Sequence, residues 1–180
     1  MKVEINKSMK LSEHFTLGEL CKTKHVTEDG NIPSHVSIEN LKRICENWLE
    51  DLRYSYNMLY VHSGVRPQSK VAGDCTLAPD PGAAPETEEA IVINSGYRSP
   101  AVNLLAGGAK TSNHLSGCAV DIRCVGKEQM IRYASILLDI ADGTKQEFDE
   151  MLLEQHGSTV WLHFAVRPKD NRRRIAFLKA

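Results

Sequence analysis

Two side chains capable of metal chemistry, His114 and Asp121, lie seven residues apart in the segment INSGYRSPAVNLLAGGAKTSNHLSGCAVDIRC. Gly117 allows a sharp bend between them, and the alternation in AVDIRC predicts a strand from which Asp121 projects. An imidazole and a carboxylate together suit Zn²⁺, but two ligands do not complete a site. The segment therefore predicts part of a metal site and requires a third ligand elsewhere in the chain.

The candidate third ligand is His163, in the late segment VWLHFAV. Alternation along a strand places Trp161 and His163 on one face and Leu162 and Phe164 on the other. A histidine in so apolar a strand is either paired in the core or a ligand, and the availability of the other two donors favours the ligand interpretation. Three protein ligands leave the fourth tetrahedral position of zinc to water, which is typical of a catalytic site.

A hydrolytic site also needs a base for the water and a cation for the substrate. Glu154 ends a predicted strand that pairs with the His163 strand, so we expect it beside the metal; the alternative is an exposed carboxylate at a strand end. Arg98, in the turn after AIVIN, offers a bidentate donor to a carboxylate or a developing oxyanion, or else bonds nearby carbonyls. His156 either assists Glu154 or faces solvent in the turn.

The elements that must position these residues follow from periodicity and turn signals. We expect three helices, the first capped by Ser34 or Ser37, and two strands followed by a hairpin that turns at Gly157-Ser158. The helices are predicted at about 35–53, 100–106 and 127–141, and the strands at 90–94, 118–124, FDEMLLEQ and TVWLHFAV. Helices with a small antiparallel sheet define an α+β fold, expected as one domain over 1–180 with a long loop or insertion at about 54–89.

Composition narrows the functional classes. The 180 residues are 42% hydrophobic and 25% charged with a net charge of −1, which is ordinary for a globular protein and offers no overall field for nucleic acid. No apolar run is long enough to insert into a membrane, and no secretory leader is recognisable. We therefore expect a cytoplasmic protein, unless another factor, such as host lysis, releases it to the cell wall. The five cysteines form no CxxC pair and are expected as buried thiols, and Arg172–Arg174 as a solvated tail.

The motifs SGYRSPAVN, SNHLSGCAVD and WLHF resemble the zinc D-alanyl-D-alanine carboxypeptidases and their L-alanyl-D-glutamate endopeptidase relatives. The similarity is closest to the branch common in phage endolysins and bacterial cell-wall hydrolases. LSEHFTLGELCKT and ENLKRICENWLEDLR also resemble this branch, so the resemblance covers most of the chain except about 54–89. It implies a hedgehog-like fold, Zn²⁺ bound by His114, Asp121 and His163, and a substrate held by Arg98 near its scissile bond.

The resemblance also bears on the base and on substrate contacts. Some relatives carry an acidic residue three positions before the last histidine, where this chain has Val160; in others a glutamate ends the preceding strand, as Glu154 does. Ser112 and, secondarily, Tyr97 are further candidates for substrate contact. The implied function is hydrolysis of peptidoglycan stem peptides, as a D,D-carboxypeptidase or an L-Ala–D-Glu endopeptidase. The alternatives are a zinc-containing binding module without catalysis, favoured if Glu154 points away from the metal, and a structural zinc protein.

Overall fold

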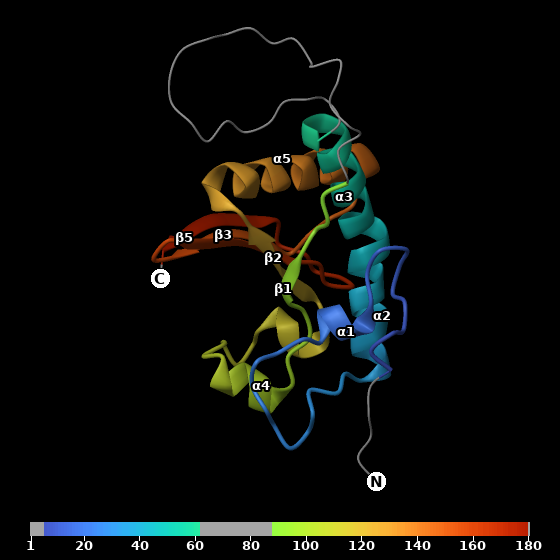
Figure 1. Ribbon diagram of the computed structural model, residues 1–180, viewed down its shortest axis with the longest axis vertical. Helices are drawn as coiled ribbons and strands as arrows, with labels where there is room; N and C mark the ends of the chain where they lie inside the picture. Colours follow the sequence, from blue (N-terminus) through green and yellow to red (C-terminus); the bar gives the residue numbers. More distant parts are fainter. Residues whose placement is uncertain (1–5, 62–87, 180) are drawn as a thin grey trace, which may run out of the picture.

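A five-stranded sheet forms the centre of the fold in the computed structural model, which describes residues 6–61 and 88–179 (Figure 1). The strand order is β1-β2-β4-β3-β5, and neighbouring strands are antiparallel except for the parallel pair β3 and β5. The strands are β1 (Ile93–Ser95), β2 (Ala119–Cys124), β3 (Glu150–His156), β4 (Thr159–Ala165) and β5 (Arg174–Lys179). The predicted α+β class is confirmed, and the arrangement is consistent with a hedgehog-like fold.

A long helical segment runs beside the sheet. It starts after Ser34, whose hydroxyl accepts a hydrogen bond from the Ser37 N–H at 3.1 Å, so Ser34 is the N-cap. Its parts are α2 (His35–Ile44), the π-helical turn η1 (Cys45–Leu49), α3 (Glu50–Tyr56) and a second π-helical turn η2 (Asn57–Val61). The remaining helices are α1 (Leu17–Leu20), α4 (Pro100–Leu105), the 3₁₀ turn η3 (Asn113–Ser116) and α5 (Gly126–Thr144).

The predicted loop at 54–89 begins too early, because residues 54–61 are helical. Tyr56 is buried and its ring packs at 4.8 Å, centroid to centroid, on Tyr133 of α5. Asn57 and Glu89 exchange hydrogen bonds, with the Glu89 N–H donating to Asn57 Oδ1 at 2.7 Å. These tertiary contacts hold a stretch whose own helix propensity is modest. The rest of the predicted insertion, residues 62–87, lies outside the described residues.

The sheet has a core face and a site face. α5 lies along the core face of the sheet (Figure 1). Trp48 of η1 packs on Phe164 at 5.0 Å between ring centroids. Leu162 and Phe164 of β4 are fully buried there. Because side chains alternate along a strand, His163 between them points to the opposite face, where the functional candidates gather.

Two smaller expectations concern cysteines and membranes. Cys21, Cys45, Cys118 and Cys124 are free and buried, as predicted, whereas Cys75 lies outside the described residues. None of the helices in the described part of the chain combines the length and apolar character needed to cross a bilayer.

Candidate metal centre

His114 is fixed in both position and tautomer by the loop around it. His114 lies buried in η3, which ends at Gly117. Gly117 has a φ of 70° and lies so close to the Ser37 carbonyl that any side chain at position 117 would collide with it. His114 Nδ1 lies 2.6 Å from the Gly96 carbonyl oxygen. Because a carbonyl can only accept, Nδ1 carries a proton, and Nε2 faces Asp121, where it donates a hydrogen bond when the ring is protonated and offers its lone pair to a metal ion when it is not.

His163 and Asp121 meet across the pairing of β4 with β2, in which they are direct partners. Asp121 Oδ1 lies 2.9 Å from His163 Nδ1 and 3.2 Å from His114 Nε2. One donor atom of each of the three buried residues lies within 4.8 Å of the others. Ligands at roughly 2.0 Å from a tetrahedral zinc are about 3.3 Å apart, so the donor set fits this ion.

The electrostatics of the three residues favour a cation between them. Burial alone would raise the pKa of Asp121, but the charge of His114 and hydrogen bonds from both histidines lower it well below the usual range. Burial alone would lower the pKa of His163, but its hydrogen bond to Asp121 and nearby carboxylates raise it. Asp121 therefore stays ionised, and a proton and a metal compete for His163 Nδ1.

Arg98 binds the outer side of the same carboxylate. Its guanidinium forms a salt bridge with Asp121 Oδ2, and its Nε donates to Ser95 Oγ at 2.8 Å. Its backbone N–H donates to the His114 carbonyl at 3.1 Å. Its second terminal amino group, Nη1, donates to no residue in the described ranges 6–61 and 88–179. Arg98 thus orients Asp121 and keeps free N–H donors for a substrate oxygen.

Glu154 lies on the site face of β3, opposite Trp161 of β4 and two residues from the Leu152–His163 pair. Its pKa is raised, first by burial and also by the negative charge of Asp121, against the opposing effect of His163. It forms no ion pair within the described part of the chain. The predicted pairing of the Glu154 strand with the His163 strand is confirmed. A partly buried carboxylate with a raised pKa, such as that of Glu154, is suited to accept a proton from water.

A second carboxylate, Glu150, was not anticipated from the sequence. Its Oε2 lies 3.8 Å from His163 Nε2, the ring nitrogen that faces away from the other donors. Its Oε1 accepts from Arg174 at 2.8 Å and lies 3.1 Å from an Arg172 Nη atom. The alternation of Glu150, Leu152 and Glu154 places Glu150 on the same face as Glu154. Its position beside His163 becomes apparent only from the register of β3 against β4.

The other sequence candidates have different surroundings. His156 is exposed at the end of β3, opposite Thr159, beyond Glu154 along the strand. The Ser112 hydroxyl accepts from the His114 N–H at 3.3 Å and caps η3, so it supports the histidine directly. Tyr97 is buried, and its N–H donates to the Leu20 carbonyl at 2.7 Å.

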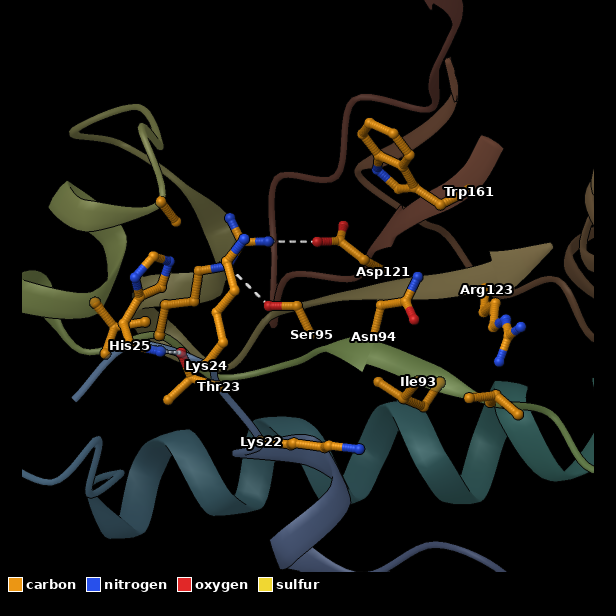
Figure 2. A pocket seen from close by; sticks show the side chains of 14 residues that line it. Lys22, Thr23, Lys24, His25, Ile93, Asn94, Ser95, Asp121, Arg123 and Trp161 are labelled. Atoms are coloured by element: carbon orange, nitrogen blue, oxygen red, sulfur yellow. Dashed lines mark hydrogen bonds and ion pairs between the residues drawn. The ribbon is translucent and has the colours of Figure 1, made fainter. Parts of the chain in front are cut away.

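A cleft of about 530 Å³ opens onto Asp121 and Arg98. Figure 2 shows its wall of β1 residues, with Trp161 of β4 on one side and the segment 22–25 on the other. Cys21, the residue before that segment, is tied to the site by Asn31. The Asn31 side-chain amide donates to the Cys21 carbonyl at 2.9 Å and to the Tyr97 carbonyl at 3.2 Å, and its side-chain oxygen accepts from the Ser99 N–H at 2.7 Å. The N-terminal region is therefore an integral part of the cleft.

These features define a class, a protein with a buried His–Asp–His set whose aspartate, Asp121, lines a substrate-sized cleft. Residues 85–163 match the family model described as Peptidase M15. Residues 85–163 are therefore similar to a Peptidase M15 domain, consistent with the D-Ala-D-Ala carboxypeptidase resemblance, and that family implies a metallopeptidase. No curated protein matches the chain.

Proposed function

We propose that the protein is a zinc-dependent hydrolase of peptidoglycan stem peptides, acting as a D,D-carboxypeptidase or an L-Ala–D-Glu endopeptidase. The observation that carries the proposal is the convergence of donor atoms from His114, Asp121 and His163 within 4.8 Å, inside the segment that matches Peptidase M15. The substrate class follows from the motif resemblance described above.

The proposed chemistry assigns each neighbouring side chain a task. Zinc, when held by the three donors, supplies Lewis acidity that makes water more acidic and polarises a carbonyl. Glu154 accepts the proton of the attacking water and returns it to the leaving amine, so the proton balance closes within one turnover. The free N–H groups of Arg98 donate to the oxygen of the scissile carbonyl as negative charge develops on it.

Orientation of the donors is part of the same proposal. The Gly96 carbonyl fixes the His114 ring, and Arg98 fixes the Asp121 carboxylate, so neither needs to reorganise as substrate binds. Glu154 lies on the face that carries the donors, and this supports the enzyme over a binding module of the same fold.

The test is a digest of purified peptidoglycan fragments read by mass spectrometry, with the zinc-loaded protein, with a chelator, and with zinc added back. Chelator-sensitive loss of a terminal D-Ala, or a cut between L-Ala and D-Glu, is the expected result and identifies the bond. A zinc-loaded protein that cuts no fragment from several wall types would refute hydrolysis and favour the binding module.

A further inference from the structure

Residues 96–99 support two of the candidate metal donors. The Gly96 carbonyl oxygen lies 2.6 Å from His114 Nδ1, and the Arg98 guanidinium forms a salt bridge with Asp121. The Arg98 N–H also donates to the His114 carbonyl at 3.1 Å. The orientation of His114 and that of Asp121 therefore both depend on the backbone conformation of this loop.

The N-terminal part of the chain supports the loop 96–99 from below the site. α1, which ends at Leu20, lies beside β1 (Figure 1). The Tyr97 N–H donates to the Leu20 carbonyl at 2.7 Å. Gly96 lies so close to the same carbonyl that any side chain at position 96 would collide with it. The backbone of the loop is therefore packed directly on the backbone of α1.

Asn31 holds the same loop on both sides of Arg98. Its side-chain oxygen accepts from the Ser99 N–H at 2.7 Å, and its side-chain amide donates to the Tyr97 carbonyl at 3.2 Å. The amide also donates to the Cys21 carbonyl at 2.9 Å, directly after α1. Asn31 is only 2% exposed, so water does not readily replace these bonds when the side chain is removed.

The residue type at position 31 suits this task. The φ of Asn31 is 52°, in the left-handed region that asparagine adopts more readily than most residues with a side chain. A side-chain amide offers an acceptor oxygen and two N–H donors, which match the one accepted and two donated bonds of Asn31. A carboxylate of the same shape could not donate to the two carbonyls.

We propose that Asn31 is a positioning residue of the metal centre, which acts on His114 and Asp121 through the loop 96–99. This role rests on the zinc site of the proposed function, and it places a determinant of zinc affinity outside the segment 85–163 that matches Peptidase M15. Partners that orient metal ligands raise metal affinity although they do not touch the ion. Loss of the Asn31 side chain therefore weakens zinc binding while all three donors remain.

The test compares the zinc affinity of Asn31→Gly with that of the parent protein, by competition with a chromogenic chelator. Glycine tolerates the left-handed backbone, so this variant removes the side chain without straining the chain. We expect zinc binding about tenfold weaker than in the parent protein. Co²⁺ bound in place of zinc has a visible spectrum that depends on ligand geometry, and its bands should shift in Asn31→Gly.

Asn57→Ala is the matched control, because Asn57 is also a buried asparagine whose side chain makes three hydrogen bonds. These bonds join it to the backbone of Arg53 and Glu89, which carry no donor of the candidate site. Both variants should lose stability in denaturant unfolding, but only Asn31→Gly should lose zinc affinity. If Asn31→Gly does not fold, Asn31→Asp replaces it, because aspartate keeps the acceptor for the Ser99 N–H and lacks the amide donor.

The zinc measurement separates this role from the function on which it rests, because it needs no turnover. Unchanged zinc affinity, or an unchanged Co²⁺ spectrum, in a folded Asn31 variant overturns the positioning role even if the protein hydrolyses stem peptides. An equal loss of affinity in Asn57→Ala assigns the effect to stability and overturns the role as well. Weaker zinc binding confined to the Asn31 variant, in a chain whose parent cleaves no stem peptide, upholds the role and overturns the peptidase.

Discussion

Asp121 and His163 lie directly opposite each other on β2 and β4, with Asp121 Oδ1 2.9 Å from His163 Nδ1. Two donors of the candidate metal centre are therefore fixed by the register of one strand pair. A slip of a single residue would turn one of them into the core face, so the same backbone hydrogen bonds that build the sheet also set the metal site.

Replacing His114 with Ala is expected to abolish stoichiometric zinc binding, because two donors do not hold the ion tightly. Zinc content of the purified protein, measured by elemental analysis, checks this. His156→Ala is the matched control, since this histidine is exposed at the end of β3 and should leave the zinc content unchanged. A His114→Ala protein that keeps its zinc would exclude the ligand role.

Replacing Glu154 with Gln is expected to lower turnover about 10²- to 10⁴-fold while zinc remains bound, because the amide cannot accept a proton from water. Steady-state kinetics on a stem peptide, with zinc content measured in parallel, checks this. Glu128→Gln, an exposed residue of α5, is the control. An unchanged rate would assign the base to another group, and His156→Ala would be the next variant to measure.

The acid limb of the pH profile reports on the same carboxylate. Burial raises the pKa of Glu154, and the base must be ionised to act. Activity should therefore fall as pH decreases, with a midpoint above the ordinary value of about 4.3 for glutamate. The measurement is kcat/KM against pH, with zinc content followed at each point to separate titration from metal loss. A midpoint at or below the ordinary value contradicts the assignment.

Replacing Glu150 with Ala is expected to weaken zinc affinity about 10- to 100-fold, because a carboxylate beside the outer nitrogen of a ligating histidine orients the ring and raises its basicity. Competition with a chromogenic chelator measures the affinity without any need for activity. Glu147→Ala is the control, an exposed carboxylate that contacts Arg173 at 3.9 Å and no donor of the site. Equal affinities for the two variants would leave Glu150 with a purely structural role.

Asp149 links pH to stability. Burial alone would raise its pKa, but hydrogen bonds from Arg172 and Asn113 lower it to about 2. A carboxyl with a lowered folded pKa stabilises the fold above its unfolded pKa, near 4, and this contribution disappears as pH falls through about 2. Asp149→Asn should therefore cost about 2 kcal/mol of unfolding free energy at neutral pH and little near pH 2. Denaturant unfolding at both pH values measures it, and a constant difference would contradict the linkage.

The three candidate metal donors could be picked out from the sequence because their signals are local. Seven-residue spacing, a glycine bend and strict alternation around His163 need no knowledge of distant contacts. Glu150 and Glu154 share one face by the same alternation, yet their different surroundings depend on which residue of β4 each one opposes. That register is a property of the folded sheet. The sequence therefore predicts the strand that carries Glu150 and Glu154, but not the different positions that the two carboxylates take beside His163.

The C-terminal arginines show a different limit. They were expected as a solvated tail, but Arg172 binds the buried Asp149 with two hydrogen bonds, at 2.8 and 2.7 Å, and Arg174 begins β5. From the sequence alone, a run of basic residues predicts solvent exposure, because its acidic partners cannot be identified without the fold. Those partners lie more than twenty residues away along the chain, and only the parallel pairing of β5 with β3 brings them together.

The attachment of Asn31 to the loop of Arg98 has an evolutionary consequence. The three candidate metal donors all lie between residues 114 and 163, whereas one wall of the cleft comes from residues 22–25. These residues follow Cys21, whose carbonyl accepts a hydrogen bond from the Asn31 side-chain amide at 2.9 Å. Backbone contacts tolerate change in neighbouring side chains. Substitutions in residues 22–25 can therefore reshape the cleft while His114, Asp121 and His163 stay unchanged, so the cleft and the candidate metal centre can diverge independently.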